Sequence, residues 1–225
     1  MSLATNYASA LHQYDQQVWN TQQKMMQERS LHSQDLVNTY MEAVLSGVPS
    51  NYLSMIEAMI ADRSAYNTRK MLLDAAELTK HQAKLKAALG AQVGVLSGGA
   101  VALSGGASSK SAIKSFDYAG KRSNALLSSM YTKLSHDRSV HMHELNNLHA
   151  EEMKLSGGQS TAFSTMLSSL INDRRTFNAR KTALDAGQWT ALQSNVRKLS
   201  LTPLLSAGEK KCKCRTRCCS SRARA

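Results

Sequence analysis

Two stretches of the chain carry large hydrophobic residues at every seventh position, with mostly polar residues between them. These residues are Tyr52, Met59, Tyr66 and Leu73 in the first stretch and Phe163, Leu170, Phe177 and Leu184 in the second. A strict seven-residue spacing favours left-handed coiled-coil packing, so the two sets are predicted to form packing and oligomer seams. The positions that would complete each seam are charged, at Arg63 and Lys70 and again at Arg174 and Lys181. Each apolar face is therefore narrow, and each helix needs neighbours.

The two stretches resemble each other residue by residue. IADRSAYNTRKMLLDA at 60–75 and INDRRTFNARKTALDA at 171–186 share nine of sixteen residues at an offset of 111. Upstream, RSLHSQDLVNTYMEAVLSG at 29–47 matches RSVHMHELNNLHAEEMKLSGG at 138–158, with an offset of 109. We interpret this pattern as a tandem duplication of a unit of roughly 75 to 90 residues.

Each unit is predicted to contain two long helices joined by a short turn. The expected helices span 4–45 and 52–89 in the first unit, and 111–155 and 161–200 in the second. The turn SGVPSN contains Gly47 and Pro49, and SGGQS contains Gly157 and Gly158, residues that commonly end helices. Short connections make neighbouring helices antiparallel. The predicted fold class is therefore all-α, a tandemly duplicated long antiparallel helical hairpin in a coiled-coil-like, elongated four-helix arrangement.

The chain is predicted to divide into two hairpins, a linker and a tail. The ranges are 1–89 for the first hairpin, 90–110 for the Gly/Ser-rich apolar linker, 111–201 for the second hairpin and 202–225 for a disordered basic tail. Hairpins from several chains could stack into a ring or tube, or one chain could form a monomeric four-helix bundle. The uncharged segment 88–109 fits a flexible linker; the alternative is a segment that touches a membrane or lines a subunit contact.

Six polar residues recur intact in the two copies. They are Asp62, Arg63, Asn67, Arg69, Lys70 and Asp74, repeated as Asp173, Arg174, Asn178, Arg180, Lys181 and Asp185. Two copies of a site would explain the recurrence, but structural pairing explains it more simply, with Lys70–Asp74 and Lys181–Asp185 as i,i+4 ion pairs. The two asparagines are predicted to lie in the seam and fix its register.

The histidines cluster at His136, His141, His143 and His149. On a helix, His141 and His143 point about 200° apart, so they cannot chelate one metal together. A solvated helical face is the expected arrangement. The chain has no nucleophile elbow, phosphate loop or paired-carboxylate motif. We therefore expect no catalysis, no cofactor and no bound metal.

The positive charge is concentrated at the C-terminal end. Of the formal net charge of +12, residues 206–225 contribute seven Lys or Arg and one Glu, or +6. The basic residues predicted to contact nucleic acid are Lys210, Lys211, Lys213, Arg215, Arg217, Arg222 and Arg224. All four cysteines also lie here, in Cys-x-Cys and Cys-Cys spacings unlike those of a zinc site. Salt-dependent contact with a polyanion is the expected role of this tail.

The remaining composition favours long helices. Aromatic residues make up only 5% of the chain, and there are only two prolines. The first residues, MSLATNYASALHQYDQQVW, have neither the basic nor the apolar region of a secretory signal, so no signal peptide is expected. No run of eighteen apolar residues occurs, so no transmembrane helix is expected either.

Two phrases carry a resemblance to known proteins. YNTRKMLLDAAELTKHQAKLKAALG and FNARKTALDAGQWTALQSNVRKL, within 52–89 and 163–199, resemble the long helices of tailed-bacteriophage virion proteins, notably the internal or ejection proteins of short-tailed phages. They are also similar to the hairpin helices of outer-membrane efflux channels, but the chain is short and lacks barrel strands and a signal. The phage resemblance implies many copies in a ring or tube, assembled in the host cytoplasm and carried in the virion.

The phage resemblance therefore implies a structural virion protein that assists genome delivery through the host envelope. The resemblance implies contacts with itself, with other virion proteins and with packaged DNA, and membrane contact through 88–109. A nucleic-acid-binding or compacting helical protein acting through its basic tail is the alternative. A membrane-active helical effector is a third interpretation, and an enzyme a distant fourth.

Overall fold

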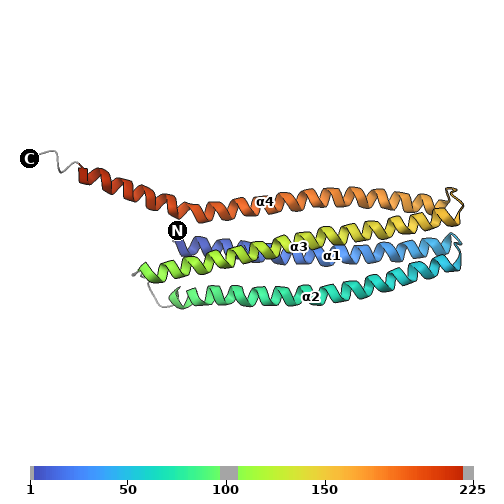
Figure 1. Cartoon of the computed structure of the whole chain (residues 1–225), viewed down its shortest axis with the longest axis horizontal. Coiled ribbons are helices and arrows are strands. Elements are labelled where there is room, and N and C mark those ends of the chain that lie inside the picture. The colour runs from blue at the N-terminus through green and yellow to red at the C-terminus, as the bar shows by residue number, and fades with distance from the viewer. Residues whose placement is uncertain (1–2, 97–105, 220–225) are drawn as a thin grey trace, which may run out of the picture.

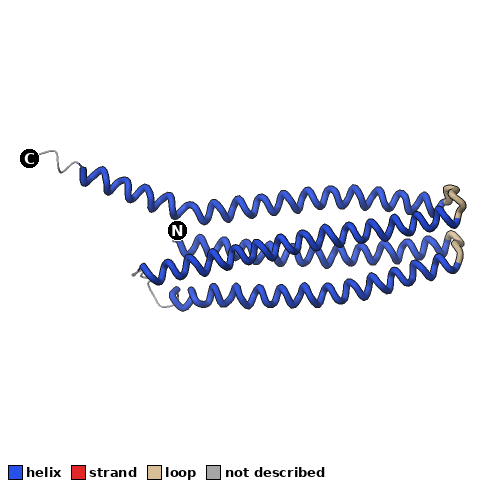
Figure 2. Tube along the Cα trace, viewed as in Figure 1, coloured by secondary structure: helices blue, strands red, loops and turns tan. Residues whose placement is uncertain are grey.

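Four long helices make up the described part of the chain. The computed structural model describes the backbone of residues 3–96 and 106–219 and the side chains of residues 9–87 and 117–196. The helices are α1 (Leu3–Leu45), α2 (Ser50–Leu96), α3 (Gly106–Leu155) and α4 (Ala162–Cys219) (Figure 1). Within the described ranges the backbone is helical except at two short turns (Figure 2), so the all-α prediction is confirmed.

Both turns end their first helix with the same backbone motif. Gly47 has φ of 68° and donates its N–H to Val44 O at 3.1 Å, while the Val48 N–H reaches back to Ala43 O at 3.2 Å. The turn after α3 repeats the pair, from Gly157 to Lys154 O at 3.2 Å and from Gly158 to Met153 O at 2.8 Å. This is the Schellman motif, whose left-handed residue favours glycine because it has no Cβ. Local chemistry therefore explains why both turns were predictable.

The two hairpins pack on each other within one chain. α1 and α3 each contact all three other helices, whereas α2 and α4 lie on opposite sides of this central pair. Successive contacts along the pair are Gln17 with Tyr131, Arg29 with Asp137 and Asp35 with His141, so α1 and α3 run parallel. Both turns consequently lie at the same end of an elongated bundle (Figure 1). The 43 residues of α1 alone span about 65 Å at 1.5 Å per residue.

The buried positions repeat every eleven residues rather than every seven. Three sets are buried at four successive positions with this spacing: Ala10, Thr21, His32 and Ala43 in α1; Tyr52, Arg63, Asp74 and Leu85 in α2; and Ala119, Met130, His141 and Glu152 in α3. An eleven-residue repeat corresponds to 3.67 residues per turn, close to that of a straight helix. The helices can thus keep one face inward over their whole length.

As a packing seam within the chain, the predicted seven-residue pattern is wrong beyond its second heptad, whereas its role between chains stays a prediction. Tyr52 and Phe163 are buried, and Met59, Leu170, Tyr66 and Phe177 are half-buried, but Leu73 and Leu184 are 60% and 59% exposed. In a straight helix a seven-residue repeat drifts by about 20° per heptad, so its third interval has turned about 60° away from the core. The residues that replace these leucines inside the bundle are the acids Asp74 and Asp185.

Two apolar clusters lie toward the ends of the bundle, with charged residues between them. One cluster near the open end includes Val18, Met25 and Leu134, and the other near the turns includes Leu36, Ile56 and Leu167. In the second cluster the Tyr52 and Phe163 rings meet edge to face at 5.9 Å, and the Tyr52 hydroxyl donates to Leu148 O at 2.8 Å. The middle of the bundle is therefore held by polar contacts and its ends by apolar packing.

Two predicted boundaries move. α2 continues to Leu96 and α3 begins at Gly106, so much of the predicted linker 90–110 is helical, and residues 97–105 lie outside the described residues. α4 continues to Cys219, so the backbone of residues 202–219 is helical. The prediction of a disordered tail is therefore wrong for these residues. None of the helices in the described ranges has a stretch both long and apolar enough to span a bilayer.

Candidate functional site

Two buried arginines organise the middle of the bundle. Arg29 on α1 donates from Nε to Asp137 Oδ2 and from Nη1 to Asp74 Oδ2, both at 2.8 Å. Arg138 on α3 donates twice to Glu28 at 2.7 Å and once to Asp185 Oδ2 at 2.8 Å. All six side chains are almost fully removed from solvent. Each arginine therefore ties the central pair of helices to one outer helix.

A lysine completes each of these clusters in the same way. Lys133 contacts Asp74 at 3.0 Å and Glu77 at 2.8 Å, while Lys24 contacts Asp185 at 3.0 Å and Gln188 at 2.5 Å. The residues of the two clusters correspond at offsets of 109 between α1 and α3 and 111 between α2 and α4. The same contacts therefore recur in both halves, although their tandem origin stays an inference from the sequence.

A stacked pair of histidines occupies the centre of the bundle. The rings of His32 and His141 lie 4.1 Å apart with an interplanar angle of 12°. The Nε2 atom of His141 lies 2.9 Å from Asp35 Oδ2, and Arg174 on α4 binds the same carboxylate at 2.5 and 2.6 Å. On the other side Arg63 on α2 pairs with Glu144 on α3. Two equivalent ion pairs, each joining the first half of the chain to the second, thus lie next to the two rings.

Burial governs the ionisation of this pair. It lowers the pKa of His32 to about 3, and the nearby His141, Arg63 and Arg174 oppose protonation further, against the attraction of Asp35. For Asp35, burial by itself would raise the pKa, but hydrogen bonds from His141 and Arg174 leave it lowered. His32 is consequently neutral at ordinary pH, beside an ionised carboxylate.

The histidine prediction is partly wrong. His136 and His143 are exposed, as expected, but His141 is fully buried, and His149 is half-buried with Ser168 Oγ at 2.9 Å from its Nε2. His32 was not singled out from the sequence. The repeat contained the signal, because His32 aligns with His141 at the offset of 109.

The repeated polar residues separate into an inner and an outer group. The inner group consists of Arg63, Asp74 and Asp185, which are buried, and Asn67, Lys70, Arg174, Asn178 and Lys181, which are half-buried. The outer group is exposed and consists of Asp62, Arg69, Asp173 and Arg180. Asn67 donates to Ser33 Oγ on α1 at 2.9 Å and to Arg29 O at 3.3 Å, which links α2 to α1. This position fits the predicted register role.

The two predicted i,i+4 ion pairs are replaced by pairs between helices. Asp74 and Asp185 face the interior, where arginines and lysines of other helices bind them. Lys70 and Lys181 instead lie over the rings of Tyr66 and Phe177, each at 5.4 Å from the centroid. Each aspartate faces the core, where basic residues of neighbouring helices balance its charge. The lysine four residues earlier on the same helix therefore packs over an aromatic ring instead.

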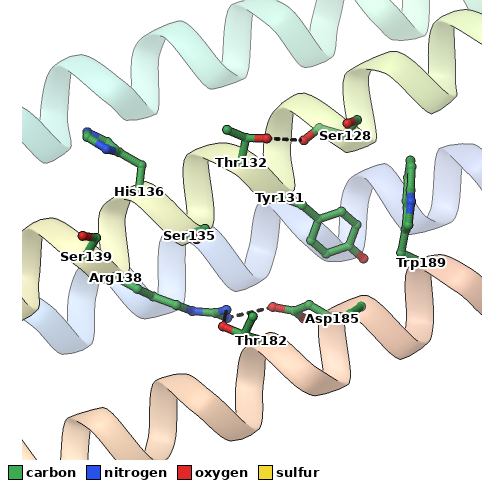
Figure 3. Close-up of a pocket in the computed structure, with 11 residues that line it drawn as sticks. Ser128, Tyr131, Thr132, Ser135, His136, Arg138, Ser139, Thr182, Asp185 and Trp189 are labelled. Atoms are coloured by element: carbon green, nitrogen blue, oxygen red, sulfur yellow. Dashed lines mark hydrogen bonds and ion pairs between the residues drawn. The ribbon is translucent and has the colours of Figure 1, made fainter.

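A groove of about 570 Å³ lies between α3 and α4. It is lined by Ser128, Tyr131, Thr132, Ser135, His136, Arg138, Ser139, Thr182, Asp185, Ala186 and Trp189 (Figure 3). Tyr131 and Trp189 meet edge to face at 5.6 Å at one end of it. Arg138 donates to Thr182 Oγ1 at 3.1 Å and to Asp185, so the charges in the groove are already paired. Small hydroxyl side chains on α3 leave the space open.

Metal ligands and nucleic-acid contacts are the remaining candidate chemistry of this chain. In the part of the chain with described side chains, no three His, Cys, Asp or Glu residues are grouped as metal ligands. The predicted nucleic-acid residues between Lys210 and Arg224 lie where no side chain is described. Comparison with protein-family models, curated proteins and solved structures gives no match for this chain.

Proposed function

We propose that this chain is a structural virion protein that oligomerises into a ring or tube and assists genome delivery through the host envelope. The observation that supports self-association is an apolar stripe on the outside of α1. Trp19, Met26, Val37, Met41 and Val44 all expose much of their side chains and recur at helical spacings along this helix. Large apolar residues gathered on one exposed face commonly mark an interface.

The stripe lies on a face without free charge. Between residues 19 and 44 the charged residues of α1 are Lys24, Glu28, Arg29, Asp35 and the exposed Glu42, which lies about 100° around the helix from Met41. The first four are engaged with α2, α3 or α4 inside the bundle. Depletion of charge is typical of the buried part of protein interfaces. A partner could therefore cover this face without stripping water from an unpaired charge.

Genome delivery is supported by the resemblance of the helices to phage internal proteins and by the basic C-terminal end. In this proposal the protein is assembled in the host cytoplasm, resides in the virion and contacts other virion proteins. Residues 206–225, with a charge of +6, face packaged DNA.

Light scattering of the purified chain at high salt tests the assembly. High salt suppresses clumping through the basic tail, so a discrete mass at a multiple of 24.6 kDa is expected. Electron microscopy of that species should then give ring-shaped end-on views. A stable 24.6 kDa monomer at all accessible concentrations would contradict the proposal.

The concentration of seven basic residues in the last twenty favours a second function, binding or compaction of nucleic acid. Fluorescence anisotropy with a labelled duplex should show an affinity that falls steeply with salt. A chain ending at residue 205 is the matched control and should lose this binding while the helices up to that residue stay folded. If this shortened chain still assembles, DNA binding and assembly are separate properties.

A further inference from the structure

The groove between α3 and α4 has a counterpart between α1 and α2. Its wall residues Ser128, Ser135 and Thr182 are equivalent to Trp19, Met26 and Met71 of the first half, at the offsets of 109 for α3 and 111 for α4. The counterpart, lined by Met26, Met71, Arg29 and Asp74 among others, holds only about 100 Å³. The buried Arg–Asp pairs beneath both are equivalent. The difference between the two places is therefore in the side chains at the surface.

The large side chains of the first half do more than fill their groove. Trp19 is 49% exposed, Met26 37% and Met71 43%, so all three project into solvent as a ridge. We call these three residues the ridge, and the lining of the α3/α4 concavity the groove. One half of the molecule thus has three large, partly exposed apolar side chains where the other half has a wider hollow.

The ridge and the groove lie on opposite sides of the bundle, at the same position along its long axis. α1 and α3 run parallel and meet along the central line of the bundle, where His32 stacks on His141. The two halves are therefore related by an approximate two-fold rotation about the long axis of the bundle. Equivalent positions keep the same distance from the two turns, which lie at one end (Figure 1).

We propose that the ridge of one copy docks into the groove of the next copy, with the bundles parallel and in axial register. The proposal rests on the proposed ring or tube and specifies its subunit contact. The contact is heterologous, because each copy offers a ridge to one neighbour and a groove to another. Such contacts propagate, and they close into a ring when the rotation between neighbours divides a full turn.

The chemistry of the two surfaces is compatible. The ridge is apolar, and the rings of Tyr131 and Trp189 provide an apolar end wall in the groove, beside small hydroxyl side chains (Figure 3). Arg138 and Asp185 already satisfy each other, so docking leaves no new buried charge. His136 is the remaining ionisable residue of the lining, and it is exposed. A ridge-to-ridge contact, by contrast, would leave the groove empty.

Cysteine cross-linking distinguishes these arrangements. Because every native cysteine lies at or beyond residue 212, replacing these four by serine gives a full-length chain without reactive thiols. Met26→Cys and Ser135→Cys are then introduced together, and a short bis-maleimide, which tolerates imperfect geometry, is added to the assembled protein. The double variant should give a ladder of dimers, trimers and higher species. An equal mixture of the two single variants should give dimers only.

Three outcomes separate the ideas. A dimer formed by Met26→Cys alone would overturn the proposal in favour of a ridge-to-ridge contact. Absence of the ladder while the parent chain shows a large mass would overturn the docking and leave the ring or tube standing. A parent chain that stays monomeric would remove the proposed assembly and this contact with it.

Filling the groove provides an independent measurement. Ser135 is exposed, so Ser135→Trp should leave the fold and its thermal melt unchanged while blocking the ridge. The concentration at half assembly should rise at least tenfold. Leu184→Ser, a change at another exposed position outside the groove, is the control and should leave assembly unchanged. Assembly of Ser135→Trp at the parent concentration would overturn the proposal.

Discussion

Replacing Arg138 by methionine should destabilise the bundle much more than replacing Arg29 in the same way. Both arginines are almost fully buried and bind two carboxylates on neighbouring helices. Removing one partner of a buried ion pair typically costs about 3–5 kcal/mol, because the remaining charge stays desolvated. The two replacements differ in what they leave behind.

Glu28 makes both of its hydrogen bonds to Arg138, so Arg138→Met leaves this buried carboxylate with no described partner. Arg29→Met leaves Asp137 with the Tyr66 hydroxyl at 2.7 Å and Asp74 with Lys133 at 3.0 Å. We expect a loss of about 4 kcal/mol for Arg138→Met and of about 2 to 3 kcal/mol for Arg29→Met.

Urea denaturation followed by circular dichroism measures both losses, at one protein concentration and in high salt. The decisive comparison is the double variant Arg138→Met with Glu28→Met, which replaces the bidentate pair by apolar side chains. It should recover most of the stability lost in the single variant. The one carboxylate that remains next to position 138 is then Asp185, and Asp185 keeps its ion pair with Lys24. The reasoning is refuted if Arg138→Met costs less than about 1 kcal/mol, or if the double variant is less stable than the single one.

Three further predictions concern the register, the central histidines and the turns. Ile56→Ala should lower the free energy of unfolding in urea by about 2–5 kcal/mol, and Leu73→Ala by less than about 0.5 kcal/mol. Equal losses would instead support the seven-residue pattern. Because the pKa of His32 falls from 6.5 to about 3 on folding, the unfolded chain binds more protons between these values. Stability should therefore decrease by about 2 kcal/mol from pH 8 to pH 5, and a His32→Gln chain that keeps this decrease would refute the assignment. Gly157→Ala should lower the free energy of unfolding by about 1 kcal/mol through its φ of 65° alone, since no atom lies within 4 Å of the new Cβ; an unchanged melt would contradict this.

The helices and their turns could be predicted from the sequence because their signals are local. Gly47, Gly157 and Gly158 take the left-handed conformation that ends a helix, and Thr161 caps α4 by accepting the Ser164 N–H at 2.9 Å. Such bonds join residues a few positions apart, so they form in the same way wherever the helices later pack. The predicted ends at residues 45 and 155 agree with the structure for this reason.

The inward face of each helix was harder to predict. A phase error of about 20° per heptad is negligible for Tyr52 and Met59 but carries Leu73 to the surface. The charged residues concealed the correct period, because Arg63 and Asp74 occupy core positions that usually hold apolar residues. Once the acids and arginines are accepted as core residues, the eleven-residue spacing can be read directly from the sequence.

The sequence alone determined the four long helices, their Schellman turns and the correspondence between the two halves, since each depends on short-range chemistry or on residue identity. Only the tertiary structure decided that the hairpins pack within one chain, that Arg29 and Arg138 each bind acids on two neighbouring helices, and that His32 stacks on His141. A buried charge is stable only when a residue of opposite charge on a neighbouring helix binds it. The parallel packing of α1 against α3 decides which helix supplies that residue. The same packing places the Trp19 ridge and the Ser135 groove on opposite sides of the bundle, a relation that neither hairpin contains by itself.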